Sequence, residues 1–379
     1  MTLSPTAVMR ERAAELRSSG RAVIDLSAGE LDFPTPGHIV ERAASAMTDP
    51  ANHHYGPSAG LPALRDAIAA DASDRFRCEI GRANVTVTNG AKQGIFNTIL
   101  SVASASDDVL IPAPYWVTFP SAVRIAGATP RIVEPASDSL QVTPAELDDA
   151  ATAKTAALIL ASPHNPTGTA YDAETLAAIA RWCADRGIWL IYDETYERLR
   201  LDGPSMSPAA VYPPILPRLV SIGSVSKAYA MTGWRVGWAI SPVSTAKRIV
   251  AIQSHTTSNV NQVAQYAALA ALEGPDVSAQ FRDRLKARHR KTEEILAPLR
   301  DTCSVVSGTF YLFLRLPAGF DDVVTAGQIL ETAGVITMPG SAFGRPGYLR
   351  ISVAVNDDDL ERGVRLINSH LTVGRGQRL

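Results

Sequence analysis

The stretch Ser224-Val225-Ser226-Lys227, followed after a short loop by Met231-Thr232-Gly233-Trp234-Arg235-Val236-Gly237, carries the strongest chemical signal in this sequence. It comes directly after an apolar, strand-like run, Leu219-Val220-Ser221-Ile222. A lysine amine can condense with an aldehyde to form a Schiff base, and serine hydroxyls and an arginine are donors that suit a phosphate dianion. Pyridoxal 5'-phosphate carries both an aldehyde and a phosphate. The stretch therefore predicts a site for this molecule, with Lys227 as the reacting amine.

Alone, this pattern is weak, because short motifs recur by chance and Lys227 could be an ordinary surface lysine. A second signal lies at residues 85–88, which alternate like a strand and lead through Asn89-Gly90-Ala91-Lys92 into a helical run over 94–103. A glycine turn between a strand and a helix exposes backbone N–H groups at the positive end of the helix dipole. This turn is a second candidate phosphate-binding site, although many such turns bind no ligand.

Three further side chains follow runs that are typical of buried strands, at residues 108–112, 156–160 and 188–192. They are Trp116, Asn165 and Asp193. The carboxyl ends of parallel strands meet at the edge where α/β proteins bind ligands. There the Trp116 ring could stack on a planar cofactor or pack in the core. The Asp193 carboxylate would need a cation, and a protonated pyridine nitrogen could supply one.

Two residues nearer the ends of the chain are candidates for holding a substrate carboxylate. Arg350 is central in a strand pattern, where a guanidinium suggests bidentate capture of a carboxylate. The alternative is an edge-strand arginine paired with a surface acid. Gly29 follows a short strand over residues 23–26, and a glycine there either allows close approach of a ligand to the backbone or makes a turn.

Composition narrows the class of partner. The 379 residues have 46% hydrophobic content and a net charge of −2, with 36 basic and 38 acidic residues. The chain therefore has no excess of basic residues of the kind that binds nucleic acid or an anionic membrane. Small molecules or a second copy of the chain are the expected partners. The three cysteines, Cys78, Cys183 and Cys303, lie far apart, which indicates neither a zinc site nor a disulfide framework. With no signal peptide or membrane span apparent, a cytoplasmic location is expected.

Four motifs together resemble the class I, fold-type I aminotransferases that use pyridoxal phosphate. They occur in the order and spacing of that family, and the resemblance runs from about residue 20 to about residue 370. The motifs are Asn165-Pro166-Thr167-Gly168, Asp193-Glu194-x-Tyr196, Ser224-x-Ser226-Lys227 and Gly233-Trp234-Arg235-x-Gly237.

The resemblance implies an α/β fold. A large domain over residues 41–284 would contain a mostly parallel, seven-stranded sheet flanked by helices. A smaller α+β domain would combine residues 1–40 and 285–379. A long helix over residues 278–300 would join the two, and residues 234–240 would form one more strand, with Arg235 at its start.

The resemblance also implies a role for each site residue. Lys227 would hold the cofactor as a Schiff base and, once displaced, move the proton. Asp193 would keep the pyridine nitrogen protonated, while Asn165 and Tyr196 would hydrogen-bond the phenolic oxygen. Trp116 would stack on the ring. The phosphate would contact Gly90, Ala91, Lys92, Ser224, Ser226, Arg235 and, from the other subunit of a homodimer, Tyr55. The substrate would contact Arg350, the Gly29 backbone, Trp116 and Asn165.

Within the family the chain looks most like the bacterial aspartate aminotransferase branch, subgroup I-gamma. In that branch a lysine in the phosphate turn and a Ser-x-Thr near the N-terminus hold the distal carboxylate, and Lys92, Ser4 and Thr6 match them here. Aspartate or glutamate is therefore the expected amino donor, with a 2-oxo acid as acceptor in a ping-pong reaction. Leu31 and Val260 depart from the family by replacing usual prolines, which leaves the substrate less certain than the chemistry.

Alternatives remain within and outside this chemistry. Prephenate or aromatic specificity, a specialised biosynthetic pathway, or a β-elimination or cyclisation would use the same lysine and carboxylate. Whether Lys92 contacts the substrate or the phosphate is also open. A sensor domain of a transcription regulator is disfavoured, because the sequence shows neither a DNA-binding domain before residue 20 nor a basic segment.

Overall fold

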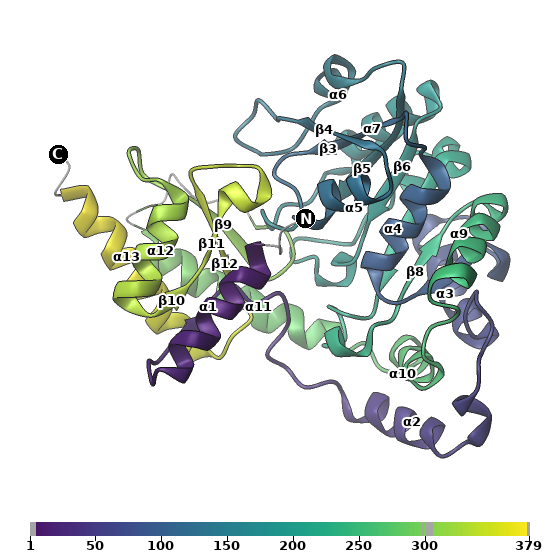
Figure 1. Cartoon of the computed structure of the whole chain (residues 1–379), viewed down its shortest axis with the longest axis horizontal. Helices are drawn as coiled ribbons and strands as arrows, with labels where there is room; N and C mark the ends of the chain where they lie inside the picture. Colours follow the sequence, from purple (N-terminus) through teal and green to yellow (C-terminus); the bar gives the residue numbers. More distant parts are fainter. Residues whose placement is uncertain (1–4, 298, 300–305, 377–379) are drawn as a thin grey trace.

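The computed structural model describes residues 5–297, 299 and 306–376. Figure 1 shows a large part built around one twisted sheet and a smaller part beside it, which contains both ends of the described chain. Among the described residues, no helix is both long enough and apolar enough to cross a membrane.

The large part is organised on a seven-stranded, mostly parallel sheet, which confirms the predicted fold class. Only β8 runs antiparallel to both of its neighbours. In spatial order the strands are β2 (Val85–Thr88), β8 (Gly237–Ile240), β7 (Leu219–Ser224), β6 (Trp189–Asp193), β5 (Thr155–Ala161), β3 (Asp108–Pro112) and β4 (Thr129–Val133).

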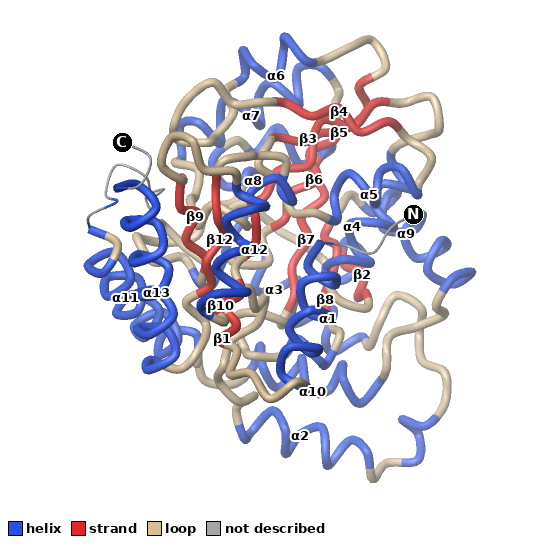
Figure 2. Tube along the Cα trace, turned by 60° about the vertical axis from the view of Figure 1, so that its left-hand side comes forward, coloured by secondary structure: helices blue, strands red, loops and turns tan. Residues whose placement is uncertain are grey.

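Both faces of this sheet are covered by helices, as Figure 2 shows, so the central strands are apolar on both sides. Alternation divides their side chains between two core clusters, with Ile191 on one face and Leu190 and Tyr192 on the other. The face of Ile191 packs on α4 (Ala91–Val102), α5 (Thr118–Ile125) and α9 (Val243–Thr256). The core on the other face includes residues of α3 (Pro62–Phe76), α6 (Pro144–Ala150), α7 (Ala173–Arg186), α8 (Pro208–Val211) and α10 (Gln262–Glu273), and α2 (Gly37–Met47) packs on α10.

The smaller part has its own sheet and core. Its three-stranded antiparallel sheet has the order β11 (Met338–Pro339), β12 (Tyr348–Ser352) and β9 (Tyr311–Arg315). A short parallel pair joins β1 (Ile24–Asp25) to β10 (Val335–Ile336). The helices are α1 (Pro5–Ser18), α11 (Ser278–Ile295), α12 (Asp322–Ala333) and α13 (Asp357–Gly376). The two clusters support a division of the chain into two parts, while the boundaries at 40/41 and 284/285, which fall inside α2 and α11, remain a proposal.

Two predicted elements begin or end elsewhere. The strand predicted over residues 234–240 begins at Gly237, because Thr232–Trp234 forms a 3-10 turn and Arg235 takes a left-handed backbone with φ 58°. A strand cannot contain that conformation. The helix predicted to reach residue 300 ends at Ile295, where α11 stops.

Candidate active site

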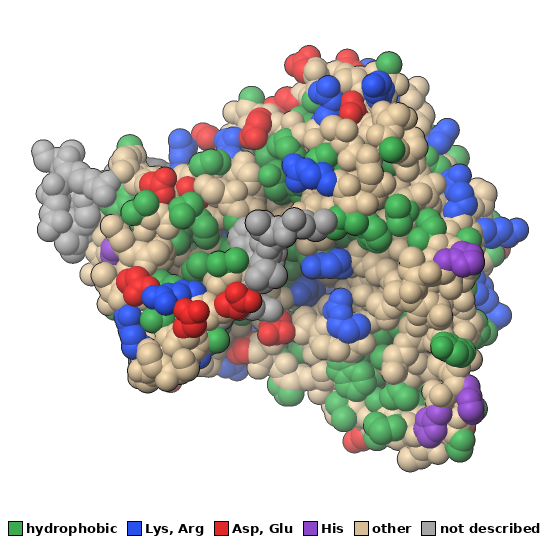
Figure 3. Space-filling view, in the orientation of Figure 1, with side chains coloured by type: hydrophobic (Ala, Val, Ile, Leu, Met, Phe, Trp, Pro, Cys, Tyr) green, Lys and Arg blue, Asp and Glu red, His purple; other side chains and the backbone are tan. Residues whose placement is uncertain are grey.

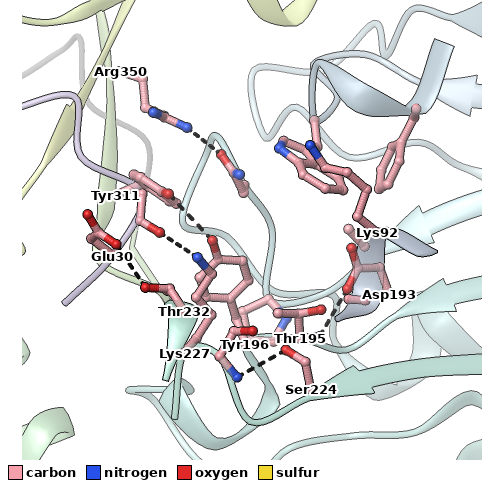
Figure 4. A pocket seen from close by; sticks show the side chains of 18 of the residues that line it. Glu30, Lys92, Asp193, Thr195, Tyr196, Ser224, Lys227, Thr232, Tyr311 and Arg350 are labelled. Carbon is pink, nitrogen blue, oxygen red and sulfur yellow. Dashed lines mark hydrogen bonds between the residues drawn. The ribbon is translucent and has the colours of Figure 1, made fainter. Parts of the chain in front are cut away.

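The sequence-predicted residues meet at the carboxyl edge of the large sheet, in a cavity of about 430 Å³. Strands β6 and β7 pair in parallel with Asp193 opposite Ile222, so the segments that follow them emerge side by side. Figure 4 shows these side chains directed into the cavity. The predicted residues that line it are Gly29, Ala91, Lys92, Trp116, Asn165, Asp193, Tyr196, Ser224, Ser226, Lys227, Arg235 and Arg350.

The start of α4 forms one wall of the cavity and depends on two glycines. Gly90 precedes the helix with φ +77°, and a Cβ there would meet the guanidinium of Arg235. Gly237 lets β8 approach the same turn, since a Cβ on it would lie 2.6 Å from the backbone nitrogen of Ala91. Arg235 is held by donation from Nη1 to the Thr232 carbonyl at 2.7 Å. Helix N–H groups and a guanidinium therefore face one place, which suits a phosphate.

Lys227 brings the amine to the other side of the cavity. Its Nζ donates to the backbone carbonyl of Gly29 and lies 6.0 Å from the ring centroids of Tyr196 and Phe310. Ser224 and Ser226 precede it and also line the cavity, and the Ser226 N–H donates to the Ser224 hydroxyl at 3.3 Å. The amine is thus held at the cavity wall by backbone and aromatic groups, in a position to react with a bound molecule.

Asp193 is a buried carboxylate at the end of β6. Burial raises its pKa, and this rise is opposed by hydrogen bonding from Thr195 and by the charge of Lys227. The Thr195 N–H donates to Asp193 Oδ1 at 3.0 Å, which fixes the orientation of the carboxylate. No salt bridge to Asp193 occurs in the part of the chain that the structure describes. A cationic group placed in the cavity would offset the cost of this burial.

Arg350 and Asn165 form a hydrogen-bonded pair across the two parts of the molecule. Arg350 lies on β12, the central strand of its sheet, and is 3% exposed, so the alternative of an edge-strand arginine is wrong. Its Nη1 donates to Asn165 Oδ1 at 3.0 Å and its Nη2 to the Ser27 carbonyl at 2.8 Å. Its Nε is buried without a partner among the described residues. Because Asn165 Oδ1 accepts from Arg350, its amide nitrogen is the group left to donate.

Lys92 lies in the first turn of α4, and its Nζ is 5.0 Å from the centroid of the Trp116 ring. Its pKa is lowered, chiefly by burial and then by repulsion from Arg235. Lys92 and Arg235 are neighbouring cations at the edge of one cavity. An anion bound between or beside them would offset their repulsion, so the pair indicates an anion site.

Among the described residues, the predicted Gly90 and Tyr55 do not line the cavity. Tyr55 is 88% exposed on the loop before α3, and it does not line the cavity of its own chain. Ser4 lies outside the described residues. Thr6 belongs to α1, but its side chain is likewise outside what the structure describes.

Besides Ser27, four polar lining residues were not among the predicted site residues. Tyr311 on β9 is buried, accepts a hydrogen bond from the Tyr196 hydroxyl at 3.4 Å, and has the Arg350 guanidinium 4.2 Å above its ring. Its only sequence signal is a hydroxyl inside the apolar run Phe310-Tyr311-Leu312-Phe313. The others are Thr195, Glu30 and Thr232, the last two joined by a hydrogen bond of 2.8 Å.

Comparison with known proteins agrees with this geometry. The family model for class I and II aminotransferases matches residues 21–367. An aspartate aminotransferase from Streptomyces avermitilis is 39% identical, over 97% of this chain and 94% of that protein. A probable aspartate/prephenate aminotransferase from Aquifex aeolicus is 36% identical, over 97% and 96%. The structure of Thermus thermophilus aspartate aminotransferase with maleate is 33% identical, with a TM-score of 0.92 over 98% of this chain and 97% of that one.

The fold and the site thus define a pyridoxal-phosphate-dependent transferase of the α/β type. The chain belongs to the class I and II aminotransferase family. It is an amino-acid aminotransferase, as the four motifs predicted.

Proposed function

We propose that this aminotransferase binds pyridoxal 5'-phosphate in the cavity at the edge of the large sheet. The observation that carries the proposal is the presence of an amine, a buried carboxylate and an anion seat around one space of about 430 Å³. The phosphate would contact the start of α4, Ser224, Ser226 and Arg235. Asp193 would face the ring nitrogen, and Trp116 would cover the ring. When bound, the cofactor supplies an electron sink for the substrate α-carbon.

The residues of this chain then direct the proton. The Lys227 amine reaches the reacting face of the cavity and would take the proton from the substrate α-carbon and deliver it to the carbon that carried the aldehyde of the cofactor. The Asp193 carboxylate would keep a proton on the ring nitrogen. Asn165, through its amide nitrogen, and Tyr196, through its hydroxyl, would donate to the phenolic oxygen. The Arg350 guanidinium would bind the substrate α-carboxylate, for which its Nε is available.

We further propose that the amino donor is aspartate or glutamate. Support comes from Lys92, a partly buried cation at the cavity edge that is not paired with a carboxylate among the described residues. The Thermus relative was solved with maleate, a dicarboxylate, which agrees with a second anion site in such a cavity. Ser4 and Thr6 stay predicted partners of the same distal carboxylate.

A substitution at Lys92 separates this proposal from its alternative. Lys92→Ala should lower kcat/KM for aspartate and glutamate about 10- to 100-fold, the loss of one charged hydrogen bond, and lower it far less for alanine. Lys154→Ala, at an exposed lysine, is the matched control. Equal losses for all donors would instead make Lys92 a phosphate ligand.

The same proposal includes a homodimer in which Tyr55 reaches the phosphate of the other subunit. Support comes from the exposure of Tyr55 together with Val40 and Met47 on α2, which are 88%, 45% and 59% exposed. Figure 3 shows hydrophobic side chains gathered on the surface over α2 and α10. An apolar face of this kind is typical of a protein interface.

The cytoplasmic location expected from the sequence also stays a prediction.

A further inference from the structure

A second, much smaller cavity of about 10 Å³ lies next to the active-site cavity. Thr195 and Ser224 line both spaces, so these two residues form the wall between them. Glu194 and Trp238 also line the small cavity. The cavity therefore borders the residues that hold Asp193 and the proposed phosphate seat, without being part of the site already described.

Three buried polar atoms around this cavity have no hydrogen-bond partner among the described residues. They are Glu194 Oε1, Thr195 Oγ1 and Trp238 Nε1, on residues that are 1%, 9% and 5% exposed. A buried polar atom without a partner is destabilising, because it has lost its hydrogen bonds to water, and native proteins rarely leave several such atoms together. Three such atoms lining one cavity point to a shared partner.

The surrounding contacts fix where two of these atoms lie. Glu194 Oε2 accepts from Arg75 Nη1 at 2.8 Å, which leaves Oε1 as the unsatisfied oxygen of the carboxylate. The indole of Trp238 lies against Gly223, where a Cβ would be 2.6 Å from Cε2. Any larger residue at Gly223 would therefore displace the Trp238 ring.

The charge and size of the cavity select its ligand. Its charged lining consists of Arg75 and Arg198 against Glu194 and Glu197, so it has no excess of either sign. About one water molecule fits in roughly 10–15 Å³, provided that it has two to four polar partners. A neutral molecule that both donates and accepts matches an indole N–H, a carboxylate oxygen and a hydroxyl.

We propose that this cavity is a binding site for one internal water molecule. The water accepts from Trp238 Nε1, donates to Glu194 Oε1 and completes the hydrogen bonding of Thr195 Oγ1. It joins the turn after β6 to β8, across the end of β7. Because the Thr195 N–H holds Asp193 Oδ1, the water and Trp238 act as positioning groups for the Asp193 carboxylate.

A crystal structure of the cofactor-loaded protein at a resolution that shows ordered waters tests the site directly. We expect one density peak within hydrogen-bond distance of Glu194 Oε1 and Trp238 Nε1. An empty cavity, or a rotated side chain that pairs these atoms with each other, would overturn the proposal. This result does not depend on which reaction the enzyme catalyses, so its failure is distinct from failure of the proposed function.

The positioning role rests on the proposed cofactor and is tested by Trp238→Phe, which keeps an aromatic ring at this position but removes the indole N–H. The expected results are loss of the water peak and a dissociation constant for pyridoxal phosphate raised roughly fivefold, as for one lost hydrogen bond. Trp182→Phe is the matched control, since Trp182 Nε1 donates to Asp148 Oδ1 at 3.2 Å, and neither residue lines either cavity. An unchanged constant in Trp238→Phe would refute the positioning role. If Trp238→Phe fails to fold, the presence or absence of the water peak in the electron density of the wild-type protein still tests the proposed water site.

Discussion

At the scale of single residues, the chemistry depends on side chains whose surroundings differ from those of ordinary surface groups. Lys227 is the clearest case, because its amine reaches the cavity wall while the core around it is built by other residues. Lys227→Ala should lower transamination at least about 10³-fold, the range expected when a positioned proton-transfer group is lost. Its unfolding midpoint should remain close to that of Lys247→Ala, a substitution at an exposed lysine on α9. Near-normal turnover by the Lys227 variant would refute the role given to this residue.

His289 provides a residue-scale prediction about pH. Burial lowers its pKa from 6.5 to about 4, and its Nε2 lies 3.3 Å from the Thr309 carbonyl. The unfolded chain therefore binds a proton between pH 6.5 and pH 4 that the folded chain does not, so stability falls as the pH falls through this window. At pH 5 the loss is about 2 kcal/mol relative to pH 7.5. Urea midpoints at both pH values should differ less in His289→Gln, and equal differences would contradict this.

The residues that the sequence identified are those whose chemistry is unusual for their position. Lys227, Asp193 and Asn165 follow strands where polar groups need a reason, and all three line the cavity. Tyr311 escaped notice, because an aromatic residue in an apolar strand is typical of a core. Only the pairing of β9 with β12 brings it under the Arg350 guanidinium.

At the scale of elements, the turn between β2 and α4 is the most constrained part of the site. Gly90→Ala would strain a backbone with φ +77° and push a Cβ against the Arg235 guanidinium. We expect the dissociation constant for pyridoxal phosphate to rise at least about tenfold, since a misplaced guanidinium loses a charged hydrogen bond to phosphate.

The matched control for Gly90→Ala is Gly327→Ala in α12, where a Cβ would meet nothing within 4 Å. It should stabilise the helix by about 0.5–1 kcal/mol and leave cofactor affinity unchanged. Equal effects of the two substitutions on cofactor affinity would contradict the role of the β2–α4 turn.

Strands were predictable where the sequence has a continuous apolar run, as in β6 and β7. The boundary of β8 was not, because Trp234 and Val236 look like strand residues while Arg235 takes a left-handed conformation. That conformation accompanies tertiary contacts, namely donation from Arg235 Nη2 to the Asn89 carbonyl at 3.4 Å and from Trp234 Nε1 to Thr35 at 3.2 Å. Contacts between residues far apart in the chain cannot be predicted from the residues next to Arg235.

At the scale of the whole molecule, the proposed dimer predicts that two defective variants can restore activity when they are combined in one dimer. A monomeric enzyme could not recover activity in this way. If each site combines Lys227 of one subunit with Tyr55 of the other, then Lys227→Ala and Tyr55→Ala damage different subunits of the same site. At a pyridoxal-phosphate concentration that leaves the Tyr55→Ala dimer mostly unloaded, unfolding and refolding the two variants together should restore about one quarter of wild-type activity, because half of the randomly formed dimers hold one intact site. Mixing without recovery, although each variant refolds and dimerises, would place Tyr55 outside the partner's site.

The central claim, an aminotransferase that uses acidic donors, is tested most directly by the visible spectrum of the protein loaded with pyridoxal phosphate. Aspartate or glutamate, added without a 2-oxo acid, should bleach the visible band of the bound cofactor, and 2-oxoglutarate should then restore it. Alanine at the same concentration should act far more slowly. A bound cofactor whose band no amino acid bleaches would contradict the account, and bleaching by apolar donors alone would contradict the acidic specificity.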